Sequence, residues 1–209
     1  MKKVIRSNHP LVQDRLVQLR DQQSDIVKFR RAVHQISELL ILEWLREMPV
    51  QPVLVKTPVT EMVGHQLAPV PICLVPVLRA GLGMVDGVLE WLPAASIRHV
   101  GMARNEETLR PSVYLTKLDE SLEEQRVIIL DPMLATGGSA IETIQLVKAV
   151  GAKQIDFMCI IAAPEGVEAI HNAHPDVDIY VASVDERLND RGFIVPGLGD
   201  AGDRLFGTL

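Results

Sequence analysis

A buried run that ends on a carboxylate and continues into a glycine turn is the most informative feature of the sequence. Residues 127–130 are apolar, Asp131 follows at once, and the turn Thr-Gly-Gly-Ser at 136–139 opens a segment of helical periodicity. Backbone N–H groups at a helix start have no partner inside the helix, and together with the helix dipole they attract anions. Residues 136–139 are therefore predicted to hold a phosphate.

Asp131 requires a different partner, because a carboxylate and a phosphate repel each other. It suits sugar hydroxyls or a metal ion, so an acid beside a monophosphate site predicts a ribose 5-phosphate. The turn is not a Walker A loop, since the GxxxxGK[ST] spacing and its lysine are missing. An ordinary strand-to-helix turn capped by Thr136 or Ser139 is the alternative, and this stretch alone leaves it open.

The hydrophobic pattern predicts the elements that position these residues. Two N-terminal helices are expected at 10–22 and 24–47, the second capped by Ser24. Continuous apolar runs at 72–78, 96–103, 127–130, 155–163 and 177–184 are typical of parallel strands covered on both faces. Helical patterns at 83–91, 138–149 and 165–173 alternate with them. The order predicts an α/β fold with right-handed crossovers, in one domain covering residues 1–209.

Four unusual stretches should converge at one edge of this sheet. Ligands bind beyond the carboxyl ends of parallel strands, where residues 78–84, 104–110 and 131–139 fall, and 192–203 follows the last strand. Residues 105–117 lack clear periodicity and predict a long mobile loop or a hairpin. The glycine-rich tail from Gly192 to Gly207 has no period.

Composition excludes several classes of function. The net charge of −6 provides no basic footprint for nucleic acid, although local donors could still hold a small anion. No apolar run approaches the roughly 18 residues of a membrane span, and the basic start lacks the apolar stretch of a signal peptide. Cys73 and Cys159 read as buried thiols of a cytoplasmic protein. His171 and His174 are spaced for a metal but lack a third ligand, so a solvent-facing pair is expected.

The sequence DPMLATGGS at 131–139 resembles the signature loop of type I phosphoribosyltransferases, which bind 5-phosphoribosyl 1-diphosphate (PRPP). The general family often has a second acid where this chain has Pro132, and the proline form is that of the uracil phosphoribosyltransferase branch. The resemblance implies a parallel β-sheet core flanked by helices, an N-terminal helical segment and a C-terminal hood that binds the base. It assigns PRPP contacts to Asp131, Pro132, Met133, Leu134, Ala135, Thr136, Gly137, Gly138 and Ser139.

Three further motifs carry the same resemblance. VPVLRAGLGM at 75–84 resembles the loop that binds the diphosphate, through Arg79, and GMARNEETLRP at 101–111 is similar to the motif in which Arg104 binds PRPP. The tail GFIVPGLGDAGDRLFGT at 192–208 is similar to the segment that holds uracil. The uracil contacts carried over are Ile194, Gly199, Asp200 and Ala201. Asp200 also lies near PRPP and Mg²⁺, which it would hold through water. Asp131, Asp200 and Arg104 are the implied catalytic residues.

The implied reaction joins uracil and PRPP to give UMP and diphosphate, with Mg²⁺ as cofactor and an oxocarbenium-like transition state. Residues 105–117 would form a lid over it. The resemblance further implies a homo-oligomer and GTP as a possible effector. Two alternatives stay open at this point. One is a regulatory module that binds PRPP or a nucleotide and contacts RNA, and the other is a phosphoribosyltransferase for purines or orotate.

Overall fold

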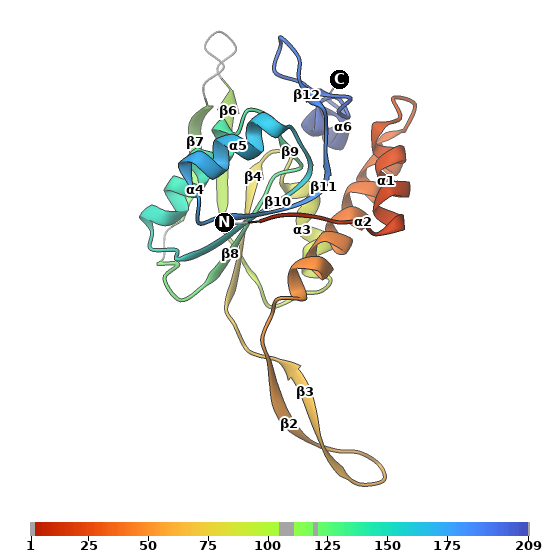
Figure 1. Ribbon diagram of the computed structural model, residues 1–209, viewed down its shortest axis with the longest axis vertical. Helices are drawn as coiled ribbons and strands as arrows, with labels where there is room; N and C mark the ends of the chain where they lie inside the picture. The colour runs from red at the N-terminus through yellow and green to blue at the C-terminus, as the bar shows by residue number, and fades with distance from the viewer. Residues whose placement is uncertain (1–2, 105–110, 119–120, 209) are drawn as a thin grey trace.

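The computed structural model describes residues 3–104, 111–118 and 121–208, and it is built around one mostly parallel sheet (Figure 1). The strand order is β1-β11-β10-β8-β4-β6-β7, with β5 beside β4 and β9 beside β10. The strands are β1 Val4–Arg6, β4 Ile72–Leu78, β5 Ser96–Ile97, β6 His99–Arg104, β7 Pro111–Lys117, β8 Arg126–Leu130, β9 Met133–Leu134, β10 Gln154–Ala162 and β11 Asp178–Val184. Only the β6–β7 pair in this sheet is antiparallel among the described residues. The predicted parallel sheet is confirmed.

Helices cover both faces of the sheet, and the strand residues divide between two cores. One core joins α1 Pro10–Arg20, α2 Ile26–Leu45, α3 Leu82–Leu89 and α6 Ala201–Phe206 to the face that carries Leu74, Ile128 and Met158. The other joins α4 Gly138–Ala149 and α5 Pro164–Ala173 to the face that carries Val75, Ile129 and Phe157. Because neighbouring strand residues point to opposite faces, continuous apolar runs are needed to fill both cores.

The two N-terminal helices form as predicted, although their ends differ by up to two residues. The cap of α2 is Asp25, whose carboxylate accepts the Lys28 N–H at 2.8 Å. The predicted cap Ser24 instead donates its hydroxyl to the Gln18 carbonyl at 2.7 Å, across the turn between α1 and α2. Both residues are good caps by type, so the sequence did not distinguish them. No helix in the described part of the chain is long and apolar enough to cross a membrane.

The sequence pattern missed an antiparallel hairpin that extends from the body of the molecule (Figure 1). Strands β2 Val50–Lys56 and β3 Glu61–Leu67 pair along their whole length, from Val50 opposite Leu67 to Lys56 opposite Glu61. We call this hairpin, residues 50–67, the arm. The arm lacks the long continuous apolar run that is typical of a parallel strand buried on both faces, so the sequence pattern did not predict it.

Residues 111–117 correct one prediction and confirm another. They form β7, which pairs antiparallel with β6, so the hairpin reading is right and the loop reading is wrong for this part. Residues 105–110, which complete the predicted lid, lie outside the described residues. The tail also has more structure than its composition indicated, since it contains β13 Ile194–Val195, which pairs with β12 Arg187–Leu188 just before the tail, and then α6.

Candidate active site

Asp131 stands directly after β8, at the carboxyl edge of the sheet. Its N–H donates to the Met158 carbonyl at 3.2 Å, and its carboxylate accepts the Met133 N–H at 3.4 Å. Part of the residue reaches solvent, yet protein atoms surround the carboxyl group. This desolvation raises the pKa of Asp131 to about 7, and the Met133 N–H only partly opposes it. The carboxyl therefore changes charge near neutral pH.

The loop after Asp131 is fixed to β10 by its backbone. The Pro132 carbonyl accepts the N–H groups of Ile160 and Ile161, each at 3.1 Å, and the Leu134 carbonyl accepts the Ala163 N–H at 2.8 Å. Pro132 and Leu134 are buried. Of the nine PRPP positions that the resemblance assigns within this loop, these two therefore anchor the loop with side chains turned into the protein. The other seven, Asp131, Met133, Ala135, Thr136, Gly137, Gly138 and Ser139, lie in the same loop and at the start of α4.

The start of α4 has the geometry that the Thr-Gly-Gly-Ser turn predicted. Gly137 precedes the helix with φ +84°, and its carbonyl accepts the Ile141 N–H at 2.9 Å. A Cβ at Gly137 would lie 2.9 Å from the Ala169 Cβ of α5, so a side chain is excluded on steric grounds as well. Thr136 is exposed and Ser139 is half-buried. The first N–H groups of α4 have no intrahelical acceptor and are available to an anion.

The loop that carries Arg79 lies against the end of β8. A Cβ at Gly81 would stand 2.3 Å from the Leu130 carbonyl, so only glycine permits this approach. Arg79 itself is exposed, and its Nη2 lies 3.2 Å from Asp203 Oδ1 in α6. Two of the predicted stretches, 78–84 and 131–139, are therefore adjacent in space, and Arg79 connects them to the tail.

The tail brings Asp200 to the same place. Asp200 caps α6 by accepting the Asp203 N–H at 2.9 Å. A Cβ at Gly202 would be 3.2 Å from Asp200 Oδ1 and 3.6 Å from Arg79 Nη2, which puts these two side chains beside each other. These contacts bring together three of the four stretches predicted to converge, 78–84, 131–139 and 192–203; most of the fourth, 104–110, lies outside the described residues.

The other predicted base contacts lie along the same tail. Ile194 is buried in β13, Gly199 is exposed with φ +81°, and Ala201 is buried at the start of α6. Ile194 and Ala201 are only 4% and 3% exposed, so their side chains are not free to contact a base. Arg104 ends β6, which pairs with β4 through Leu78 opposite Gly101, so its backbone lies at the carboxyl edge too. Its side chain lies outside the described part of the structure.

Sequence reasoning missed three charged residues that hold the tail. Asp185 follows β11 and bonds with Arg20 at 2.6 and 2.7 Å, while Arg204 donates to three backbone carbonyls. Burial alone would raise the pKa of Asp185, but the bonds from Arg20 and the Gly197 N–H outweigh it and lower the pKa. Asp185 follows a buried apolar run, as Asp131 does, so this pattern could have identified it.

The two histidines do not behave as expected. His174 is buried at the end of α5, with Nδ1 3.3 Å from Lys148 Nζ and Nε2 3.3 Å from the Ile141 carbonyl oxygen, so the predicted solvent-facing pair is wrong. Burial, with the nearby Lys148 charge, lowers the pKa of His174. Within the described ranges, no group of three His, Cys, Asp or Glu residues is arranged to hold a metal. Cys73 and Cys159 are free and buried, as predicted.

Comparison with known proteins agrees with the motifs. Residues 6–208 match the sequence family described as uracil phosphoribosyltransferase. A protein named uracil phosphoribosyltransferase from Anoxybacillus flavithermus is 52% identical over 208 residues, covering all of both chains. One of the same name from Ligilactobacillus salivarius is 55% identical over 201 residues, or 96% of each chain.

Solved structures agree with the fold. The AQ2163 protein from Aquifex aeolicus superposes with a TM-score of 0.91, at 37% identity over 98% of both chains. A purine phosphoribosyltransferase from Pyrococcus horikoshii, at 19% identity, covers 74% of this chain and 84% of its own with a TM-score of 0.51, which speaks for the fold alone. The chain is an enzyme with the type I phosphoribosyltransferase fold, and it belongs to the uracil phosphoribosyltransferase family.

Proposed function

We propose that this enzyme transfers the phosphoribosyl group of PRPP to uracil, forming UMP and diphosphate. The observation that carries the proposal is the meeting of three different sites at one edge of the sheet. They are an anion site at residues 136–139, the Asp131 carboxyl, and the contact between Arg79 and the tail. A 5-phosphate, ribose hydroxyls and a diphosphate are the groups that these three would bind, in that order.

Each part has a defined chemical task in this proposal. The N–H groups of α4 and the hydroxyls of Thr136 and Ser139 anchor the 5-phosphate, and this remote binding orients the reacting carbon. Ionised Asp131 holds the ribose hydroxyls and stabilises positive charge that develops on the ring as the C1–O bond breaks, in an oxocarbenium-like transition state. Arg79 and Arg104 donate charge-assisted hydrogen bonds to the departing diphosphate.

Main-chain groups of the tail read the base. Uracil presents an acceptor, a donor and an acceptor along one edge, which the backbone at Ile194, Gly199 and Ala201 would match. Cytosine reverses two of these three groups, and each mismatch would leave a buried group unpaired at a cost of roughly 1–3 kcal/mol. Residues 192–203 contain no lysine or arginine, so no cation there would pair with the carboxylate of orotate.

The residues present fit a weakly coordinated Mg²⁺. Asp200 is exposed and uses Oδ1 to cap α6, and the described residues hold no three-ligand cluster. Such a site suits Mg²⁺, which binds through few protein ligands and keeps several waters. Asp200 would hold the ion through water, and the ion would neutralise charge on the diphosphate.

The test of this function is formation of UMP from uracil and PRPP with Mg²⁺ by the purified chain. Cytosine, orotate, hypoxanthine and guanine replace uracil in control reactions, and EDTA replaces Mg²⁺ in another. Magnesium-dependent UMP, with no product from the other bases, supports the assignment. Binding of PRPP without product from any base would contradict it and would favour a regulatory module instead.

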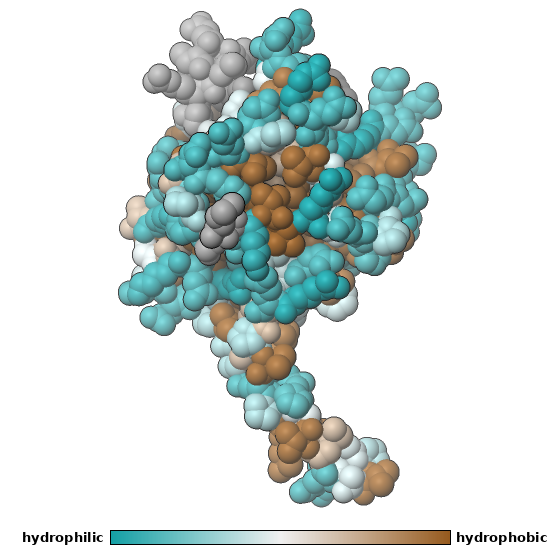
Figure 2. Space-filling model, viewed as in Figure 1, coloured by the Kyte–Doolittle hydropathy of each residue, from teal (hydrophilic) through white to brown (hydrophobic). Residues whose placement is uncertain are grey.

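We also propose that the enzyme is a homo-oligomer that uses the arm. Figure 2 shows apolar residues along the arm, and side chains such as Leu54, Val59 and Val63 have 69%, 93% and 60% of their surface exposed. An isolated two-stranded hairpin is marginally stable in water, so a covering partner would stabilise it. Light scattering should give a mass above 23.1 kDa, and Leu54→Glu with Val63→Glu should lower it toward that value.

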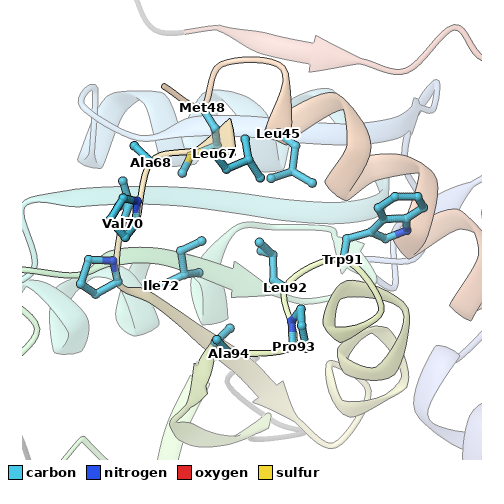
Figure 3. A pocket seen from close by; sticks show the side chains of 13 residues that line it. Leu45, Met48, Leu67, Ala68, Val70, Ile72, Trp91, Leu92, Pro93 and Ala94 are labelled. Atoms are coloured by element: carbon cyan, nitrogen blue, oxygen red, sulfur yellow. The ribbon is translucent and has the colours of Figure 1, made fainter. Parts of the chain in front are cut away.

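A pocket of about 400 Å³ beside the base of the arm supports this assembly. Leu67, Ile72, Leu92 and Trp91 come from different segments around it (Figure 3). Its lining is almost entirely apolar, and Trp91 is 48% exposed. Large exposed apolar patches mark interaction sites. A partner chain that covers the arm would cover this pocket too.

We also propose GTP as an effector and the cytoplasm as the compartment. A pocket of about 500 Å³ on the outside of α1 and α2 is lined by Arg15, Lys28 and Arg31, whose charges suit a polyphosphate. Adding GTP to the UMP assay tests the effector directly. Free buried thiols suit the reducing conditions of the cytoplasm.

A further inference from the structure

The segment between the predicted base contacts is held by an ion pair that the proposed reaction does not use. Arg20 is the last residue of α1, and Asp185 follows β11, so both are fixed by the ends of regular elements. The Asp185 side chain is only 1% exposed. Its N–H donates to the Ala162 carbonyl at 2.8 Å, which ties its backbone to β10.

Both polar groups of the Gly197 backbone bind this pair. The Gly197 N–H donates to Asp185 Oδ2 at 2.9 Å, and the Gly197 carbonyl accepts from Arg20 Nη1 at 2.8 Å. Arg20 closes the arrangement with two bonds to the carboxylate, and Ser183 Oγ donates to Asp185 Oδ1 at 3.0 Å. A backbone unit held at both of its polar groups by a bidentate ion pair has little freedom to reorient.

Gly197 transmits this constraint to Ile194. Its φ is +68°, and a Cβ there would stand 2.2 Å from the Ile194 carbonyl oxygen, so the two backbones are in direct contact. On the other side, the Leu198 carbonyl accepts from Arg204 Nη1 at 2.7 Å, and the Arg204 guanidinium stacks 4.3 Å from the centre of the Phe29 ring. The segment 194–199 is therefore fixed between two of the predicted base contacts, Ile194 and Gly199.

We infer that the Arg20–Asp185 pair is a positioning device for base selection. It holds the backbone of residues 194–199 in the orientation that distinguishes uracil from cytosine. Recognition through main-chain groups depends on the direction in which their N–H and C=O bonds point. If the backbone moves, these bonds no longer face the base. The inference rests on the proposed function, because that function assigns base reading to this segment.

The variants that test it are Asp185→Asn and a matched control, Asp156→Asn. Asparagine keeps the size of Asp185 but removes the charge that binds Arg20. Asp156 is also a buried acid paired with an arginine, since Arg126 Nε lies 3.1 Å away, and Trp44 Nε1 donates to it at 2.8 Å. Asp156 lies on β10 opposite Asp178 and Ile128 in the sheet, remote from the tail. Both variants lose a buried charge, and only one touches the tail.

The first measurement is steady-state kinetics with uracil, cytosine and PRPP varied in turn. We expect Asp185→Asn to raise the KM for uracil by about tenfold or more and to reduce discrimination against cytosine, because small misplacements of binding groups can cost about 100-fold. The KM for PRPP should stay within about twofold of the wild type. Asp156→Asn should leave both KM values and the discrimination unchanged.

The second measurement is hydrogen exchange of the backbone across residues 194–201, which needs no substrate. Faster exchange there in Asp185→Asn, but not in Asp156→Asn, is expected. If Asp185→Asn does not fold, Arg20→Lys keeps the charge while losing the bidentate geometry and should show the same two effects.

Equal effects of the two asparagine variants, or a change confined to PRPP, would overturn the inference. If the wild type converts no uracil, the proposed function fails by itself. Hydrogen exchange of residues 194–201 then still decides whether the Arg20–Asp185 pair orders this segment. Unchanged exchange in Asp185→Asn would refute that ordering role.

Discussion

Replacing Asp131 by asparagine separates the contribution of its carboxylate to the reaction rate from its effect on the free energy of unfolding. Asparagine has nearly the same size, and its Oδ1 can still accept the Met133 N–H, which lies 3.4 Å from the Asp131 carboxylate. It cannot ionise. Burial raises the pKa of Asp131 from the ordinary 3.8 to about 7, so the substrate-free enzyme holds the charged form at a cost in free energy.

The sign and size of this cost follow from the two pKa values. Between about pH 4 and pH 7 the folded protein binds more protons at Asp131 than the unfolded chain, so the free energy of unfolding falls as the pH rises. Above pH 7 the full difference is present, which is up to about 4 kcal/mol at 1.36 kcal/mol per pH unit. The variant avoids this loss, so its stability relative to the wild type should increase by up to that amount between pH 4 and pH 8.

Activity should change in the opposite direction. If the ionised carboxylate holds the ribose hydroxyls, kcat/KM for PRPP in the wild type rises with pH through an apparent pKa of about 7. Hydrogen bonds to a charged group contribute about 1.5–3 kcal/mol each, so losing two of them should lower the rate roughly 100-fold or more. The pH dependence near 7 should disappear in Asp131→Asn.

Urea unfolding measured from pH 4 upward tests the predicted effect on stability. UMP formation measured from pH 5.5 upward tests the predicted effect on activity independently. Asp14→Asn, at an exposed acid of α1, is the control for simple loss of a negative charge. A stability difference that stays constant with pH would refute the raised pKa. Unchanged kinetics with PRPP would remove the ribose role from Asp131, whatever the stability data show.

Three further predictions concern the groups around Asp131. Asp203→Asn removes the exposed partner of Arg79 at 3.2 Å and should lower the KM for PRPP by up to about fivefold, since exposed pairs contribute 0–1 kcal/mol; an unchanged or raised KM would contradict this. Gly137→Ala and Gly151→Ala both force alanine to positive φ, at a cost of about 1–2 kcal/mol in thermal unfolding, and Gly137→Ala should cost more because its Cβ would also lie 2.9 Å from the Ala169 Cβ. Only the first should also raise the KM for PRPP, because Gly151 lies outside the site, and a Cβ there would make only ordinary van der Waals contacts, 3.5 Å or more from Ser121 and Glu123. EDTA should abolish UMP formation without lowering the melting temperature, and activity that persists in EDTA would contradict the Mg²⁺ proposal.

The sheet was predictable because burial on both faces leaves a distinct pattern. Strands β4, β8, β10 and β11 lie within two residues of the predicted runs, and their apolar residues alternate between the two cores. The arm follows no such rule. Its strands are stabilised mainly by pairing with each other, and most of its side chains are exposed, so apolar burial provided no signal there.

The site was predictable where backbone geometry depends on residue type. Gly137, in the predicted turn, has φ +84°, and Gly81 permits an approach to β8 that no other residue allows. The tail is the opposite case. Its order comes from contacts with residues far away in sequence, such as Arg20 with Gly197, and no local pattern encodes a partner 177 residues away.

This difference bears on how the enzyme would divide its two recognition tasks. The proposed phosphate site is built from neighbouring residues of one loop, so formation of β8 and α4 is sufficient to position them. The tail has glycines at 197 and 199 and short elements, and its backbone is held at Gly197 by Arg20 and Asp185, which α1 and β11 bring together. If the tail reads the base as proposed, base selection depends on packing of the N-terminal helices, whereas phosphate binding does not. A substitution that loosens α1 should accordingly weaken discrimination between bases before it weakens PRPP binding.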